Sequence, residues 1–269
     1  MGLKKLVTAC YRNRQSEMFS RHDSERAIWL EYNGNRKGGR VPDVKDIGEH
    51  PLEGDGDFCK AETIELLKRA DIVVTNPPFS LFREYVAQLV EHGKKFLIIG
   101  GQNAITYKEI FPLIKDNRMW LGYGFKNGNA YFKPSDHKPY ASKSYFDKTT
   151  GLVKFRNVKW FTNLDHAKRH EKLRLYKRYS PEEYPAYDNY DAIEVGKIKD
   201  IPVDWDGAMG VPITFLDNHN QDEFEIIWTT DRGGDGMLED MKLPHSRYDA
   251  PVVNGKGLYK RILIRNKAL

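Results

Sequence analysis

The sequence has few cysteines and no long hydrophobic run. Cys10 and Cys59 are the two cysteines of the 269 residues, and they show neither metal-ligand spacing nor a disulfide framework. This usage is typical of a reducing compartment, and we expect both thiols to be buried as small apolar groups. No run approaches the roughly 20 apolar residues that a membrane span needs. The N-terminus also lacks a secretory signal, so we expect a cytoplasmic protein without membrane association.

The sequence also lacks clustered metal ligands. Four histidines and one glycine pair show no motif spacing, and we interpret them as ordinary loop, surface or core positions: His166, His170, His219, His245 and Gly233-Gly234. We therefore predict no metal site.

Positive charge is unevenly distributed. The net charge is only +5, but residues 126–180 contain 14 Lys and Arg against 4 Asp and Glu. Aromatic residues are interleaved with these cations, a mixture suited to phosphate neutralisation and base stacking. A solvated basic face is the alternative interpretation, and charge alone does not separate the two.

The order of predicted elements indicates an α/β protein. Residues 5–9 read as a strand, and residues 27–32 with 38–41 as a hairpin. Helices are then predicted over 61–70, 81–90 and 107–115, the second capped by Ser80, and short apolar strands over 71–75, 96–99 and 118–121. This alternation is typical of a doubly wound parallel sheet, in which 71–75 is an internal, buried strand.

Beyond residue 124 the pattern becomes irregular. Later strands are predicted over 211–216, 224–229 and 259–265. We place a boundary near Phe125, with a catalytic core in residues 1–125 and an irregular α+β region for DNA recognition in residues 126–269.

Asn76-Pro77-Pro78-Phe79 stands where an apolar strand ends and a helix begins. Pro occurs at about 5% of positions, so a Pro-Pro pair between Asn and an aromatic residue is rare by chance. A stiff strand-to-loop turn is the structural alternative, but the position after a buried strand favours chemistry.

The motif suits the methylation of a planar amine. Adenine N6 has its lone pair delocalised into the ring, so its attack on a methyl sulfonium needs hydrogen-bond acceptors. The Asn76 side-chain oxygen and the Pro77 carbonyl are candidate acceptors, and Pro77 and Pro78 remove competing N–H donors and hold the carbonyl in place. Phe79 offers a ring face for a base rotated out of the duplex.

At these residues the sequence resembles the amino-methyltransferases, whose motif is Asp/Asn/Ser-Pro-Pro-aromatic. The stretch Ala70 to Tyr85 is more closely similar to the adenine-specific EcoRI-type modification methyltransferases. The likeness returns at Phe96 to Gly100, at Asn103 to Glu109 and at Met209 to Ile213. The resemblance implies an S-adenosylmethionine-dependent, Rossmann-like fold and transfer of a methyl group to adenine in double-stranded DNA. It also implies a restriction-modification or phage system, with a cognate endonuclease that forms no stable complex.

The resemblance assigns roles to individual residues. Asn76, Pro77, Pro78 and Phe79 correspond to the catalytic motif. Asp55, Asp57 and Phe58 resemble the segment that such enzymes place against the adenine of S-adenosylmethionine. A plain Gly-Asp turn before the helix at residue 61 is an equally good interpretation of this second segment.

One expected part of the family pattern is missing. Residues 5–9 align best with the second strand of such a sheet, so we expect the first strand and its cofactor loop to lie upstream of Met1. A start codon assigned inside a longer gene, an inactivating truncation and completion by another chain remain open. We expect this chain to bind S-adenosylmethionine weakly or not at all.

Two other functions remain open. Methylation of adenine in RNA, or of a glutamine amide in protein, uses similar amine-acceptor motifs. A truncated remnant that binds DNA without transferring a methyl group is a non-enzymatic alternative.

Overall fold

The computed structural model describes residues 4–10, 27–34, 44–125, 129–133, 146–147, 149–230 and 250–269. These residues form two compact units, Met1–Val73 with Leu89–Lys94, and Val74–Gln88 with Lys95–Leu269. The predicted strand at 38–41, Gly233-Gly234 and His245 lie outside the described residues. No helix in the described ranges is long and apolar enough to cross a lipid bilayer.

The first unit contains an antiparallel sheet and one helix. Strands β1 (Leu6–Cys10), β2 (Ile28–Tyr32) and β3 (Ile47–Pro51) lie in the order β1-β2-β3, and β3 follows the short 3-10 helix η1 (Val44–Asp46). Helix α1 (Ala61–Arg69) confirms the prediction for 61–70. The strands at 5–9 and 27–32 are likewise confirmed.

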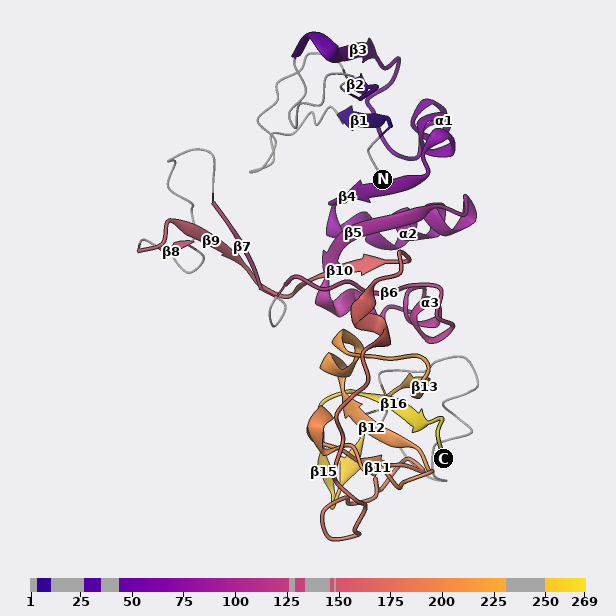
Figure 1. Cartoon of the computed structure of the whole chain (residues 1–269), viewed down its shortest axis with the longest axis vertical. Helices are drawn as coiled ribbons and strands as arrows, with labels where there is room; N and C mark the ends of the chain where they lie inside the picture. The colour runs from indigo at the N-terminus through magenta and orange to yellow at the C-terminus, as the bar shows by residue number, and fades with distance from the viewer. Residues whose placement is uncertain are drawn as a thin grey trace. The chain divides into compact units, whose positions relative to one another are not determined.

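Strands β4 (Ile72–Thr75), β5 (Lys95–Gly101), β10 (Val158–Thr162) and β6 (Trp120–Leu121) form a second sheet, in the order β4-β5-β10-β6 (Figure 1). β10 is antiparallel to both β5 and β6, so the sheet is not the purely parallel one that we predicted. The chain leaves β6 and returns directly beside it as β10, which needs no helical crossover. A strand from beyond Phe125 thus completes this sheet.

β4 differs from the prediction of a buried strand. Ile72 is 50% exposed and Val74 is 65% exposed. β4 is terminal in its sheet order, so it is not flanked on both sides within the sheet. β5, by contrast, alternates buried and half-buried residues as an internal strand does.

Short helices follow β4 and β5. The 3-10 helix η2 (Phe79–Leu81) leads into α2 (Phe82–Glu91), so the predicted cap Ser80 lies inside η2 and is not the residue directly before α2. Gly93, with φ of 60°, follows the end of α2 and donates its N–H to the Val90 carbonyl. β5 is followed by η3 (Gln102–Thr106) and α3 (Phe111–Lys115), which is shorter than the predicted 107–115.

A three-stranded ribbon is inserted between β6 and β10 (Figure 1). It consists of β7 (Ala130–Phe132), β9 (Leu152–Phe155) and β8 (Phe146–Asp147), in the order β7-β9-β8. Both pairings are antiparallel.

The C-terminal part of the second unit has its own sheet and core. β11 (Ile193–Glu194), β12 (Met209–Pro212), β16 (Arg261–Asn266) and β13 (Phe224–Thr229) lie in the order β11-β12-β16-β13, and β14 (Val252–Val253) pairs with β15 (Lys256–Gly257). The 3-10 helices η4 (Ala167–His170), η5 (Ile198–Asp200) and η6 (Ile213–Asp217) connect these elements. The prediction for 224–229 is confirmed, whereas the strand predicted over 211–216 ends at Pro212 and continues as η6.

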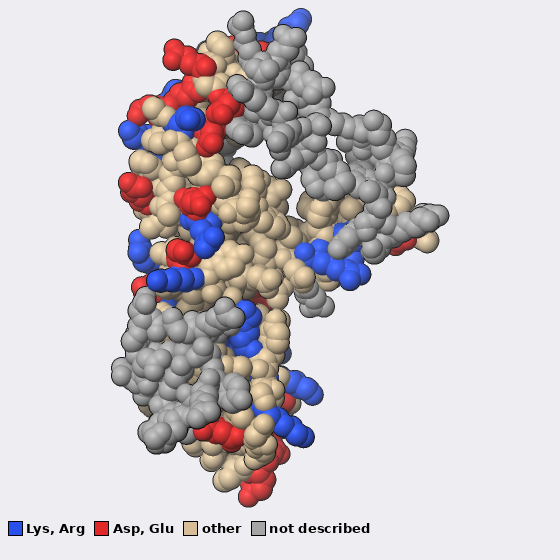
Figure 2. Space-filling model, turned by 180° about the vertical axis from the view of Figure 1, so that it is seen from behind, with Lys and Arg blue, Asp and Glu red and all other residues tan. Residues whose placement is uncertain are grey.

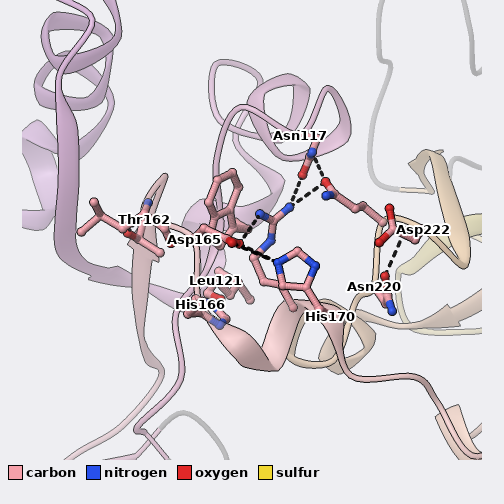
Figure 3. A network of polar contacts seen from close by, with 12 residues as sticks. Asn117, Leu121, Thr162, Asp165, His166, His170, Asn220 and Asp222 are labelled. Atoms are coloured by element: carbon pink, nitrogen blue, oxygen red, sulfur yellow. Dashed lines mark hydrogen bonds and ion pairs between the residues drawn. The ribbon is translucent and has the colours of Figure 1, made fainter.

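Arg169 organises the junction between β6 and the C-terminal part, and its partners Asn117 and Asp165 are labelled in Figure 3. Its side chain is only 8% exposed, its guanidinium lies 3.5 Å from the centre of the Trp120 ring, and it donates to Asn117, Gln221 and Asp165. Burial lowers the pKa of Arg169. Five donors in a planar fork allow one buried cation to bind all these groups at once.

Candidate active site

Asn76-Pro77-Pro78-Phe79 forms the link between β4 and α2. Asn76 is exposed and Pro77 is buried. The Pro78 carbonyl accepts a hydrogen bond of 2.9 Å from the Leu81 N–H, which starts η2. Pro77 and Pro78 have no N–H, so neither can extend β4 by pairing its amide, and the chain turns here.

The two acceptors proposed for the target amine are available for a ligand. No hydrogen bond within the described residues engages the Asn76 side chain or the Pro77 carbonyl. The Pro77 carbonyl is held at the start of a rigid turn, because the two prolines fix their own φ angles, whereas the Asn76 side chain is exposed. The site thus offers two oxygen acceptors, of which the Pro77 carbonyl is fixed by the backbone, and no N–H donor from either proline.

Gly100 and Gly101 at the end of β5 receive the aromatic side chains that follow the prolines. An ideal Cβ on Gly101 would lie 3.7 Å from the Phe79 ring, and one on Gly100 would lie 2.5 Å from the Phe82 ring. Phe82 is buried and packs on Phe161 of β10, with ring centres 4.9 Å apart. The missing side chain at Gly100 therefore makes room for the first residue of α2.

Phe79 keeps part of its ring accessible. It is 47% exposed, although it contacts Gly101. A half-exposed ring beside two acceptors can stack on a planar base while the acceptors bind the exocyclic amine of the base. The structure thus brings Asn76, Pro77 and Phe79 together, as expected for consecutive residues, and adds Gly101 to the site.

Asp55 and Asp57, two of the residues suggested for the cofactor, form consecutive turns before α1. The Asp55 carboxylate accepts from the Asp57 N–H at 3.1 Å, and the Asp57 carboxylate accepts from the Cys59 N–H at 2.9 Å. Gly56 has a φ of 79°, which suits glycine. These hydrogen bonds agree with the interpretation of this segment as a plain Gly-Asp turn before α1. They use one oxygen of each carboxylate.

The turn is fixed further by Glu62 in the first turn of α1. Its carboxylate accepts from the backbone N–H groups of Glu53 and Gly54, both at 2.8 Å. Cys59 lies in this turn and is exposed, so the prediction that it is buried is wrong. For Cys10 the prediction stays a prediction, because the burial of its side chain is not described.

The residue after Gly101 connects the site to the ribbon. The Gln102 N–H donates to the Asn157 carbonyl at 2.6 Å, and Gly101 pairs with Val158 in the sheet. Sequence analysis missed this connection, because it depends on β10 pairing with β5. The run of two glycines after a buried strand was the available signal.

Several cations of the basic stretch have structural roles. Lys159 is buried and binds both Asp217 carboxylate oxygens at 2.6 Å, and Arg169 is held as described above. Lys177 and Arg178 form ion pairs with Glu183 and Asp204. The two buried cations, Lys159 and Arg169, therefore do not support DNA binding, although their charges contributed to the prediction, whereas Arg178 is 81% exposed.

The other described cations of the stretch are half-buried or exposed. They are Lys133, Lys154, Arg156, Lys168, Lys172 and Arg174. The first three lie in or next to the ribbon. Lys126, Lys138, Lys143 and Lys148 lie outside the described residues.

Comparisons with known proteins agree over the whole chain. Residues 1–267 match the family model of the adenine-specific methyltransferase EcoRI. The chain is 44% identical to the Type II methyltransferase M.EcoRI of Escherichia coli, an alignment that covers 100% of this chain and 79% of that protein. No match was found among solved structures.

Two mycoplasma proteins are also similar. The Type II methyltransferase M.MpnI of Mycoplasma pneumoniae is 41% identical over 84% of this chain and 73% of that protein. The Type II methyltransferase M.MgeORF184P of Mycoplasma genitalium is 37% identical over 84% of this chain and 74% of that protein. The chain therefore belongs to the EcoRI family of adenine-specific methyltransferases.

Proposed function

We propose that this protein methylates adenine N6 within a specific site of double-stranded DNA, as part of a restriction-modification or phage system. The observation that carries the proposal is the pair of available acceptors, the Asn76 side-chain oxygen and the Pro77 carbonyl, beside the half-exposed Phe79 ring. Membership of an adenine-specific methyltransferase family supports the acceptor chemistry.

Asn76 and Pro77 act on the target amine. Two hydrogen bonds from the N6 hydrogens to these oxygens draw the nitrogen toward tetrahedral geometry, which localises its lone pair for attack. The Pro77 carbonyl needs no reorganisation during the reaction, because the prolines already fix the backbone at this point. The hydrogen bonds to both oxygens strengthen as positive charge develops on nitrogen. Phe79 stacks on the flipped base and keeps its amine against the acceptors.

The methyl donor is S-adenosylmethionine, which supplies an electrophilic methyl group when bound. Asp55, Asp57 and Phe58 suit its adenosine part, because carboxylate oxygens accept from amine and hydroxyl donors and a half-buried ring can stack on a purine. One oxygen of each carboxylate is already used by the turn, which leaves the other for a ligand.

DNA recognition is assigned to residues 126–269. The support for this assignment is the group of exposed or half-buried Lys and Arg side chains in residues 126–180, together with the aromatic residues between them. A cognate endonuclease acting on the same site would complete the system without a stable complex.

The test is methyl transfer from labelled S-adenosylmethionine to duplex DNA by the wild-type chain, the Asn76→Ala variant and the Ser80→Ala variant. Asn76→Ala should lower kcat by about a hundredfold or more, the effect of removing one preorganised hydrogen-bonding group. Ser80 is a matched control because it is also exposed and lies four residues further along. Retained transfer by Asn76→Ala would disprove the role of this side chain.

Product analysis separates the remaining functions. Nucleoside mass spectrometry after expression should find N6-methyladenine in DNA, and its appearance in RNA, or a methylated glutamine in protein, would support the other acceptors. Salt-dependent DNA binding without incorporation would indicate the inactive remnant. Calorimetry with S-adenosylmethionine tests the expectation that this chain binds its cofactor weakly, and micromolar affinity would contradict it.

A further inference from the structure

The ribbon of β7, β9 and β8 has two chemically different faces. We propose that its basic face is the surface that holds double-stranded DNA next to the target adenine, with Tyr131 contacting a base and three cations contacting phosphates. This inference rests on the proposed function and names the DNA-binding surface of that site.

The strand register defines the two faces. Ala130 pairs with Phe155, Tyr131 with Lys154, and Phe132 with Val153. Because side chains alternate along a strand and paired residues share a face, Tyr131 and Lys154 lie on one side of the ribbon. The Lys154 ammonium lies 5.7 Å from the centre of the Tyr131 ring, which confirms this placement.

The opposite face is apolar and serves the packing of the ribbon. Ala130 and Val153 are buried, and Phe132 contacts Phe155 edge-on with ring centres 5.6 Å apart. This face therefore provides the ribbon's own apolar packing. Phe132 is itself 46% exposed, and Tyr131 on the other face is 54% exposed and contacts Lys154 in place of an apolar partner.

The Tyr131 face is strongly basic. By the same alternation, Lys133 and Arg156 follow Tyr131 and Lys154 on this side, and both are exposed. Among the described residues, the acidic residue on this face is Asp147, because it pairs with Leu152, two residues before Lys154. Hydrogen bonds from the Thr149 backbone and the Thr150 side chain lower the pKa of Asp147. Figure 2 shows Lys and Arg side chains gathered on the ribbon, at the right of the view.

The ribbon begins beside the catalytic motif. Its last strand leads through Asn157 to Val158, which pairs with Gly101, the residue that contacts Phe79. The Gln102 N–H binds the Asn157 carbonyl at the same place. The ribbon strand β9 thus ends a few residues before Val158. The partner of Val158, Gly101, contacts the Phe79 ring that we expect to stack on the flipped adenine.

Two backbone turns and one ring stack fix the segments that connect the ribbon to the sheet. Gly124 and Asn157 have φ angles of 131° and 57°, so the chain turns sharply where it leaves and re-enters the sheet. Phe125 stacks on Trp160 of β10, with ring centres 5.2 Å apart and planes 13° apart. This stack ties the outgoing segment to the strand of the returning one.

Double-stranded DNA fits this surface by charge and by shape. A narrow β-ribbon enters the major groove of B-DNA, cations neutralise phosphates along its edges, and an exposed aromatic ring can contact a base. Tyr131 is flanked by cations in this way. Loss of a phosphate contact should make DNA binding less dependent on salt, whereas loss of the Tyr131 contact should leave the salt dependence unchanged.

The cations are tested with a triple variant, Lys133→Gln, Lys154→Gln and Arg156→Gln, in the full chain. Its affinity for a duplex containing the recognition site is measured by fluorescence anisotropy between low and high salt. If the three cations contact phosphates, the slope of log K against log salt should become less steep by up to about three, since each contact contributes about 0.9. At a fixed moderate salt concentration the affinity should fall at least about tenfold.

A second triple variant, Lys4→Gln, Lys95→Gln and Lys108→Gln, is the matched control, because these residues lie outside the region assigned to DNA recognition. It removes the same charge from exposed residues outside the basic stretch. A slope change in the ribbon variant that is no larger than in the control would overturn the proposal. Both variants are checked for wild-type circular dichroism, and only exposed or half-exposed side chains are altered.

Tyr131 is tested separately with Tyr131→Ala and Tyr131→Phe. The Ala variant should weaken DNA binding about tenfold, within the range for loss of one aromatic contact with a base, while the salt slope stays unchanged. The Phe variant keeps the ring and should bind as the wild type does. Wild-type affinity of Tyr131→Ala would refute this contact. These assays measure binding, so they remain decisive if Asn76→Ala refutes the catalytic role.

Discussion

Gly100→Ala tests whether the catalytic turn is positioned by the absence of a side chain on β5. A Cβ at this position would lie 2.5 Å and 2.8 Å from two Phe82 ring carbons and 2.9 Å from a Phe161 ring carbon. Both rings are fully buried. Neither ring is the free end of a flexible side chain, so at least one must shift by several tenths of an ångström.

The expected magnitude follows from two opposing effects. Overpacking of a filled core costs about 1–3 kcal/mol. Replacing glycine in a strand regains roughly 0.5–1 kcal/mol, because the unfolded chain loses conformational freedom. Gly100→Ala should therefore lower the free energy of unfolding by about 1–2 kcal/mol.

Gly101→Ala is the matched control. Its Cβ would lie 3.7 Å and 3.9 Å from the Phe79 ring, which is ordinary van der Waals contact. The same substitution one residue later should therefore leave the free energy of unfolding unchanged or raise it by up to about 1 kcal/mol. Urea unfolding followed by tryptophan fluorescence measures both variants, and equal destabilisation would refute the packing argument.

A double variant identifies the ring that is displaced. Phe82→Leu removes ring atoms from the crowded position, so it should relieve part of the strain in Gly100→Ala, with a coupling of about 1 kcal/mol. Phe82 is also the first residue of α2 and follows Phe79 by three residues. We therefore expect Gly100→Ala to lower kcat more than it weakens DNA binding. Additive free energies in the double variant would show that Phe82 is not the residue under strain.

Two further predictions concern the C-terminal half of the second unit. Burial lowers the pKa of His219 from 6.5, and its Nε2 lies 2.9 Å from the Phe224 carbonyl. The unfolded chain then binds the proton more tightly, so this contribution to stability is present above pH 6.5 and is lost as the pH falls below it. His219→Gln should flatten the dependence of unfolding free energy on pH between about 5 and 7, and an unchanged slope would contradict the assignment. Arg169→Lys should destabilise the protein by about 2 kcal/mol in urea unfolding, because an ammonium cannot both stack on Trp120 and bind several acceptors; wild-type stability would show that the stacked fork is not needed.

Local patterns determined much of this protein. The Asn76 to Phe79 motif, helix α1 and strands β5 and β13 were predicted from residues adjacent in the sequence. Proline geometry, helical periodicity and strand alternation act over a few residues, so the sequence shows them directly. The chemistry expected of the motif follows from the same four side chains.

Tertiary structure decided which elements meet and which side chains remain for function. Three features depend on which distant segments pair or pack together. They are the insertion of β10 between β5 and β6, the exposure of Val74, and the structural roles of Lys159 and Arg169. A periodic pattern does not specify a long-range partner, because many strands of similar composition could pair equally well. Only the pairing of Gly101 with Val158 places the ribbon beside the catalytic turn.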